Sequence, residues 1–178
     1  HADSLWSPLE DHHPAVRRHA VRLTETLAAD SPALRDKLCS MTADEDLRLR
    51  YQLAFSLGAL RGPQRDAALA TLLLKNPKNE WIRLAVGTSL HEGSGAVLEQ
   101  LIGPDAFVGS PAGLETIRQI AAQIGRQQRP EDVAALTQAL ATLADADDTL
   151  VSTAILTGLD ANEGSPLRAK VDAASQGR

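Results

Sequence analysis

One short phrase recurs five times along this chain at nearly constant spacing, and no other feature limits its fold so strongly. The phrase is an aliphatic residue, usually followed by Arg, with another apolar or Ala residue four positions later and a small or apolar residue directly after that. The copies begin at Val16, Leu49, Ile82, Ile117 and Leu150, which are 33, 33, 35 and 33 residues apart. A stripe at i, i+4 and i+5 is typical of a helix and not of a strand, so the repeat predicts a row of similar helical units.

A second set of helices is predicted between these repeats. An apolar pattern of helical period follows each of four prolines, a residue that is tolerated in the first turn of a helix: Pro32, Pro63, Pro130 and Pro166. We therefore expect helices near residues 14–29, 32–41, 45–60, 64–74, 80–91, 95–102, 112–127, 131–144, 148–158 and 165–174. The longest irregular stretch, Gly103 to Gly113, is expected to be a bend or an exposed loop.

Each unit is thus predicted to be a helical hairpin, and a lone hairpin cannot bury its apolar stripe. The predicted fold class is all-α, a right-handed α-solenoid of about five hairpins. The 29 Ala and 27 Leu among 178 residues fit this class, since both are strong helix formers. We expect a single domain over residues 1–178, with units near 1–29, 30–61, 62–93, 94–128 and 129–178, the last carrying a terminal helix. The seam between units should bury Val16, Ala20, Leu49, Leu53, Ile82, Val86, Ile117, Ala121, Leu150 and Ala154.

Composition excludes several classes of protein. No apolar run approaches the roughly 20 residues of a membrane-spanning helix, and the single Cys39 excludes a disulfide scaffold. The net charge of −5 argues against nucleic acid as a partner, because a phosphate backbone selects a basic surface. The chain begins with His1 and not with Met, so we expect a processed chain or a piece excised from a longer one.

The amino-acid sequence of the repeats resembles that of a known family. The run from Asp44 to Gly58, and the phrases around Val16-Arg17 and Ile82-Arg83, are similar to the second helix of HEAT repeats, in particular the short HEAT-like repeats of bilin lyases. They also resemble the HEAT segment of large exported planctomycete-type proteins, in which a dehydrogenase-like β-propeller precedes the repeats and a haem-binding cytochrome c domain follows.

That resemblance implies a scaffold that spaces and docks the neighbouring domains of an exported redox protein, or another protein partner. The compartment would then be periplasmic or secreted. Haem attachment requires Cys-x-x-Cys-His, and Cys39 stands alone, so no cofactor is expected here. The oligomeric state is not predicted.

The arginine of the phrase recurs at the same point of successive helices and predicts a structural ladder. Its members are Arg17, Arg50, Arg83 and Arg118. In HEAT repeats such arginines pair with residues of the turns between helices, here Asp11, Asp44, Asp46, Asn79 and Asp147. The last three stand three positions before the aliphatic residue, where they are also suited to capping the helix. An anion-binding surface is the alternative interpretation of this ladder.

Six side chains could line the concave face of the solenoid and contact a peptide: Tyr51, Phe55, Leu84, Thr88, Gln119 and Gln123. The aromatic pair at i, i+4 is equally consistent with plain packing within the helix.

The residues offer little support for catalysis or for a metal site. Asp11, His12, His13 and His19 are the only cluster of metal-ligand types, but the neighbouring histidines point apart and His13 sits at an N-cap position. We therefore predict no metal, no catalytic residue and no enzymatic activity for this segment. The alternative is a HEAT-like enzyme or enzyme subunit of the bilin-lyase or DNA-glycosylase type.

Overall fold

The computed structural model describes residues 2–146 and 148–160 of the chain, and these are helical with short connections. Between them they contain no β-strand, which confirms the all-α class. The α-helices are α1 (Trp6–Leu9), α2 (Pro14–Leu23), α3 (Pro32–Ser40), α4 (Leu47–Ser56), α5 (Pro63–Lys75), α6 (Glu80–Ser89), α7 (Ser94–Leu101), α8 (Asp105–Val108), α9 (Pro111–Gln127), α10 (Pro130–Asp145) and α11 (Thr149–Asp160).

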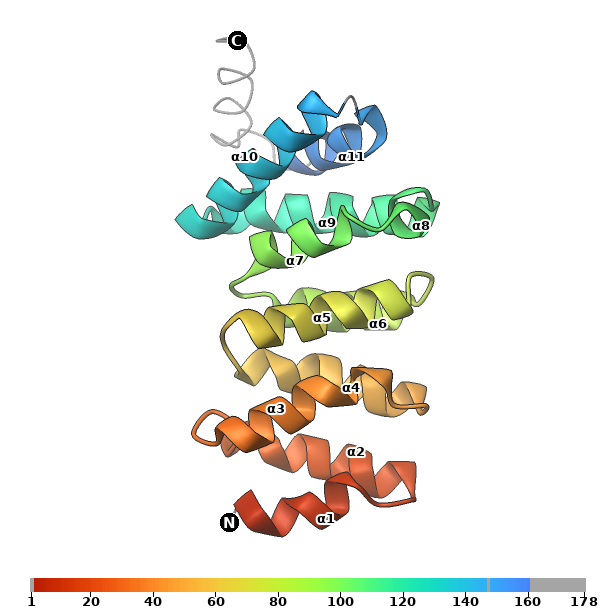
Figure 1. Ribbon diagram of the computed structural model, residues 1–178, viewed down its shortest axis with the longest axis vertical. Helices are drawn as coiled ribbons and strands as arrows, with labels where there is room; N and C mark the ends of the chain where they lie inside the picture. Colours follow the sequence, from red (N-terminus) through yellow and green to blue (C-terminus); the bar gives the residue numbers. More distant parts are fainter. Residues whose placement is uncertain (1, 147, 161–178) are drawn as a thin grey trace. The chain divides into compact units, whose positions relative to one another are not determined.

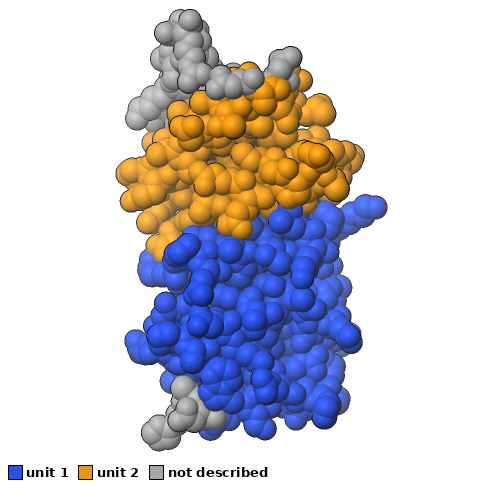
Figure 2. Space-filling view, viewed as in Figure 1, with its two compact units in different colours: residues 1–91 blue, residues 92–178 orange. Residues whose placement is uncertain are grey.

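The helices gather into two compact units, residues 1–91 and 92–178, which Figure 2 distinguishes by colour. The division falls beside the boundary at residues 93 and 94 that the sequence predicts between its third and fourth repeats. The single domain expected from the repeats stays a prediction.

Unit 1, residues 1–91, consists of the hairpins α1–α2, α3–α4 and α5–α6. Helices α2, α4 and α6 pack against one another in that order, and α3 packs against α5, so the hairpins stack in two layers. In Figure 1 α3 and α5 lie in front of the fainter α4 and α6. This is the α-solenoid packing that the repeat predicts.

Local sequence explains where the helices of the α2, α4 and α6 layer begin. The carboxylate of Asp46 accepts a hydrogen bond from the Leu49 backbone N–H at 2.7 Å, and the Asn79 side chain accepts one from Ile82 at 3.0 Å. Both residues occupy the N-cap, as predicted, and satisfy N–H groups that the first turn leaves unpaired. His13 caps α2 through Nδ1, which accepts from Ala15 N–H at 3.2 Å.

The prediction of buried residues at the seam between units is confirmed in the middle of the chain. It is wrong for Val16 near the first end and for the fifth copy of the phrase near the other. Seven of its ten members are essentially inaccessible: Ala20, Leu49, Leu53, Ile82, Val86, Ile117 and Ala121. Val16 is 40% exposed, because only the four-residue α1 precedes α2, whereas Leu49 and Ile82 are each covered by the preceding helix of their layer.

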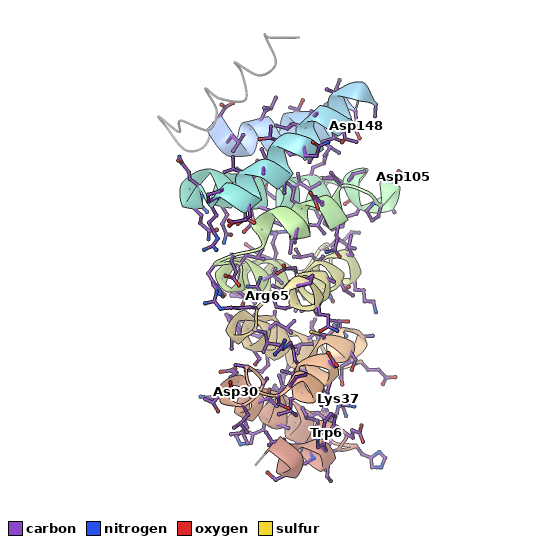
Figure 3. The ribbon with its side chains drawn as sticks, turned by 60° about the vertical axis from the view of Figure 1, so that its left-hand side comes forward. Trp6, Asp30, Lys37, Arg65, Asp105 and Asp148 are labelled. Atoms are coloured by element: carbon purple, nitrogen blue, oxygen red, sulfur yellow. The ribbon has the colours of Figure 1, made fainter. Side chains whose placement is uncertain are left out.

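The fifth copy of the phrase is one residue out of phase. Leu150 is 64% exposed and Ala154 is half-buried, while Val151 and Ile155 are buried in their place. The reason is the helix start: Asp148, labelled in Figure 3, accepts from Val151 N–H at 3.2 Å and so sets the register of α11. Asp147, which the sequence assigned to this cap, lies outside the described residues.

Unit 2 packs its helices at close range. In the described part of residues 92–178, α9 packs on α11 and α7 packs on α10. A Cβ atom on Gly158 of α11 would lie 2.2 Å from the Arg118 carbonyl oxygen, and one on Gly95 of α7 would lie 2.9 Å from the Asp132 Cα. Only glycine allows these approaches.

Several predicted boundaries differ from those observed. The helix expected over 14–29 ends at Leu23 and continues only as a 3-10 turn over Thr24–Thr26. The four-residue helices α1 and α8 were not predicted, because one helical turn has too few residues to show a period. The terminal helix expected over 165–174 lies outside the described residues.

Candidate functional site

The first predicted arginine fastens two repeats of unit 1 together. Arg17, on α2, donates from Nε to Asp44 Oδ2 at 2.8 Å and from Nη2 to Asp44 Oδ1 at 2.9 Å. Its Nη1 donates to the carbonyl oxygens of Asp11 at 2.8 Å and His12 at 3.1 Å. One guanidinium thus joins the turn before its own helix to the turn before α4, using the planar fork that suits a carboxylate.

Asp44 is held as a carboxylate by this arrangement. Burial by itself would raise its pKa, but the hydrogen bonds from Arg17 and from Asp46 N–H, with the charges of Arg17 and Arg50, outweigh burial and lower the pKa of Asp44 below its ordinary value. The hydrogen bond to Asp44 correspondingly raises the pKa of Arg17.

The second arginine has only half of these partners. Arg50 donates from Nη1 to the carbonyl oxygens of Asp44 and Glu45, as Arg17 does within its own turn. Its Nε is buried and makes no hydrogen bond with any described residue. The position 33 residues after Asp44 is Pro77, which has no side-chain acceptor to offer. Arg83 Nε is likewise buried without a hydrogen-bond partner in the described part of the chain.

The fourth arginine, Arg118, does not belong to the ladder, and this part of the prediction is wrong. Arg118 does not reach a turn; it pairs with Glu115 of its own helix, through Nη2 at 2.6 Å and Nε at 2.8 Å. It is the eighth residue of α9, whereas the earlier arginines are each the fourth of their helix. One extra turn moves its Cα about 6 Å away from the helix start, beyond the reach of the preceding turn.

The predicted turn partners also divide into two kinds. Asp44 accepts hydrogen bonds from arginine through its side chain, and Asp11 accepts through its backbone carbonyl. Asp46 and Asn79 use their side chains to cap α4 and α6 and accept no arginine hydrogen bond that the structure shows. They are therefore capping residues and not rungs of the ladder.

A buried arginine that the sequence analysis did not single out closes the third hairpin. Arg65 on α5 is fully buried and is labelled in Figure 3. It donates from Nη1 to Asp66 at 2.5 Å and from Nη2 to the Ser89 carbonyl oxygen at the end of α6 at 2.5 Å. A cation at a helix C-terminus complements the dipole and the unpaired carbonyls there. The ladder pattern could not reveal it, because Arg65 belongs to the other layer.

An exposed apolar surface lies on α4 and α6. It consists of Leu47, Tyr51, Phe55, Trp81 and Leu84, and we call it the α4–α6 surface. Trp81 is 67% exposed, and Leu47, Phe55 and Leu84 are also exposed. The rings of Tyr51 and Phe55 meet edge to face with their centroids 5.0 Å apart. A hollow of about 270 Å³ opens here, lined by Leu47, Arg48, Tyr51, Asn79, Trp81 and Ile82.

This surface contains part of the predicted concave face. Tyr51 and Phe55 share the exposed side of α4, and Leu84 and Thr88 share that of α6, the next helix of the layer. Gln119 and Gln123 are half-buried on α9 in unit 2, and Gln119 donates to Glu115 at 2.6 Å. The large apolar side chains exposed in the described part of unit 1 all lie on α2, α4 and α6, which makes this layer the candidate binding face.

The other candidate groups have local structural roles. The Asp11 carboxylate accepts from His13 N–H at 2.7 Å, and His13 caps α2, so neither is arranged around a metal. Across the described ranges no three His, Cys, Asp or Glu side chains gather as a metal site would require. Cys39 is half-buried, and burial raises the pKa of its thiol, which disfavours the nucleophilic thiolate.

Comparison with known protein families matches residues 3–91, half of the chain, to HEAT repeats. Searches of curated proteins and of solved structures give no match. Of the helices in the described ranges, none has both the length and the apolar character of a membrane span. The matched residues coincide with the three stacked hairpins of unit 1, and the chain belongs to the HEAT repeat family.

Proposed function

We propose that this HEAT repeat module is a non-catalytic scaffold that binds a partner protein on the α4–α6 surface. The observation that carries the proposal is Trp81, which is 67% exposed beside an apolar hollow of about 270 Å³. Large apolar side chains gathered on one face, and exposed to water, mark interaction sites on folded proteins. Tryptophan and tyrosine are also the residues that most often anchor protein interfaces.

The charges around the surface indicate the chemistry of the partner. Registered by the 33-residue repeat, Tyr51 and Leu84 continue a row that begins at Arg18 of α2, and Phe55 and Thr88 continue one that begins at Arg22. Arg48 lines the hollow itself. Along these two rows the face passes from Arg18 and Arg22 on α2 to mainly apolar side chains on α4 and α6. The fitting occupant is a peptide segment with apolar anchors and carboxylates, because opposite charges steer and orient association.

The expectation that the scaffold docks redox domains rests only on the resemblance of its repeat sequences to those of the exported planctomycete-type proteins. The comparisons match HEAT repeats and no redox protein. Our proposal therefore names the binding face and the chemistry of its partner, without a particular parent protein.

Selection from a displayed library of random peptides, with the full chain as target, tests the proposal. We expect enriched peptides to combine Leu, Phe or Trp with Asp or Glu. The chain has two tryptophans, so a Trp6→Phe background leaves Trp81 as the only indole reporter. Its emission should shift to the blue as a selected peptide covers it.

Paired variants show whether such peptides use the α4–α6 surface. Trp81→Ala and Phe55→Ala should each weaken binding by about tenfold or more, as expected of anchor residues. Leu150→Ala is the matched control, since Leu150 is equally exposed but lies on α11 of unit 2. Failure to enrich any sequence, or binding that survives both substitutions, would refute the proposal.

A further inference from the structure

One face of α2 is apolar and is not covered by a helix of its own layer. In α4 and α6 the equivalent face is buried, since Leu49 and Ile82 lie under the preceding helix. Val16 stands one 33-residue period before Leu49 and is 40% exposed. Leu23, seven residues later on the same side of α2, is 49% exposed. We call this side of α2, which carries Val16, Ala20 and Leu23, the outer α2 face.

A hollow of about 560 Å³ opens along the outer α2 face. Its lining is mostly apolar and includes Leu5 and Pro8 of the first hairpin, together with Val16 and Leu23. A repeat that closes the end of a solenoid needs a polar outer surface to stay in solution. The outer α2 face instead has the apolar character of an interface between repeats.

Asp11 reproduces the arrangement that binds an arginine at the next turn. It stands one period before Asp44, and Oδ1 of each carboxylate accepts from the backbone N–H two residues later, at 2.7 Å and 2.9 Å. The backbone carbonyl oxygen of each also accepts from the arginine of the helix that follows. Oδ2 of Asp44 accepts from Arg17 of the preceding repeat at 2.8 Å, whereas Oδ2 of Asp11 has no donor among the described residues. An arginine on a helix beside the outer α2 face would complete this second pair.

The other end of the face indicates how the covering helix should differ from α2. Ser56 and Gln52 of α4 donate to Glu25, which follows α2, at 2.7 Å and 3.2 Å. The position of Ser56 is taken in α2 by Leu23, which has no side-chain donor. The covering helix should therefore have an apolar side chain where α2 presents Glu25.

We propose that the outer α2 face docks a further HEAT-type helix, carried by the same polypeptide ahead of α1. The arginine of this helix donates to the Asp11 carboxylate as Arg17 does to Asp44, and its aliphatic side chains fill the hollow beside Val16 and Leu23. The packing of α2 on α4, and of α4 on α6, continues into this contact, and Asp11 supplies the complementary charge. This inference does not depend on the α4–α6 surface.

An extended chain tests the proposal with the protein's own sequence. Residues 1–33 are duplicated ahead of His1, which keeps the repeat period. The added Arg17 then stands 27 residues before Asp11, the separation that joins Arg17 to Asp44. The added copy carries Glu25→Leu to match Leu23. We expect amide hydrogen exchange in the original α2 to slow by about tenfold or more, because the added helix covers it.

Asp11→Asn separates the arginine contact from the local turn. Asparagine can still accept from His13 N–H, so exchange in α2 of the original chain should change little. In the extended chain the same substitution should remove much of the added protection, because the added Arg17 loses its charged acceptor. Leu84→Ala is the matched control: Leu84 is 49% exposed, as Leu23 is, but lies on α6, and its loss should leave α2 unchanged in both chains.

Equal exchange of α2 in the extended and original chains would overturn the proposal. An extended chain in which Asp11→Asn has no effect would contradict the arginine contact and overturn it as well. Sedimentation of the original chain tests the competing occupant. A dimer that Val16→Asp separates would assign the outer α2 face to a second copy, and this result would also overturn the proposal.

Discussion

The two units of this chain differ in how they use the arginine of the repeated phrase. Unit 1 uses directional polar contacts between elements: Arg17 joins α2 to the turn before α4, and Arg65 joins α5 to the end of α6. In unit 2 the arginine of the repeated phrase, Arg118, pairs within its own helix, and the helices instead approach at Gly158 and Gly95. The Asp132 carboxylate of α10 also accepts from Gly95 N–H of α7 at 2.8 Å.

The difference shows that one repeated phrase does not determine one kind of contact. An arginine in the fourth position of a helix lies near the preceding turn, whose carbonyl groups need donors. An arginine in the eighth position lies one turn further along and pairs within its own helix instead. Where a small residue permits backbones to come close, dispersion contacts add to the packing, and at Gly95 they accompany the buried hydrogen bond from Asp132.

Among the substitutions that compare the two units, Arg65→Ala should lower the free energy of unfolding most. It removes the buried donor to Ser89 and leaves Asp66 without this partner, and breaking a buried ion pair costs about 3–5 kcal/mol. Urea unfolding followed by circular dichroism measures the loss, and amide hydrogen exchange should localise it to residues 1–91. The exposed Arg22→Ala serves as the control, with an expected change within about 0.5 kcal/mol.

Gly158→Ala tests the close packing of unit 2. Alanine in place of glycine favours a helix by up to about 1 kcal/mol, so an open position would gain stability. Here the added Cβ meets the Arg118 carbonyl oxygen, and we expect a net loss of about 2 kcal/mol from overpacking. Gly103→Ala adds a Cβ with no heavy atom within 4 Å and should be nearly neutral. A stabilised Gly158→Ala variant would show that α9 and α11 are not tightly apposed.

Asp44→Ala tests the polar fastening of unit 1 and its dependence on pH. Loss of the hydrogen bonds from Arg17 should cost about 1–2 kcal/mol near pH 7. The pKa of Asp44 is lowered in the folded chain, so its contribution is present above the unfolded-state pKa of about 4 and is lost as the pH falls through the folded-state pKa.

The measurement for Asp44 is the free energy of unfolding of both proteins from pH 7 to pH 2. The difference between them should be constant above about pH 5 and shrink below pH 4. A difference that grows on acidification would contradict the assigned sign of the pKa shift.

Arg118→Ala should lower the free energy of unfolding least. Its partner Glu115 lies three residues away on the same helix and both side chains are partly exposed, so the pair is worth about 0.2–0.5 kcal/mol. Arg17→Ala, at the equivalent position of the phrase, should cost several times more because it also loses carbonyl acceptors in the turn. Equal losses for the two arginines in urea unfolding would remove the distinction between the units.

Much of the fold could be predicted because its signals are local. The stripe at i, i+4 and i+5 lies on one helical face, and the caps Asp46 and Asn79 stand three residues before the N–H groups they satisfy. The same reasoning failed at Leu150, where Asp147 and Asp148 are both suitable caps and only the packed structure shows that Asp148 sets the register.

The candidate binding surface could be predicted from the sequence only in part. Tyr51, Phe55, Leu84 and Thr88 follow from the repeat, since equivalent positions of stacked helices must face the same side. Trp81 did not, because exposure depends on what the neighbouring helix covers. That Arg50 lacks the carboxylate partner that Arg17 has could be recognised only from the geometry of both turns.

The sequence by itself determined that this chain is all-α, that its helices form hairpins and that they stack, because a period of about 33 residues and apolar stripes of helical period admit little else. Only the tertiary structure decided which arginines hydrogen-bond to a neighbouring turn or helix and which apolar surface stays exposed to solvent. Arg17 and Asp44 are 27 residues apart, and Arg65 and Ser89 are 24 apart. Pairing over such distances depends on where each helix starts and how closely its neighbour packs, which no local pattern records.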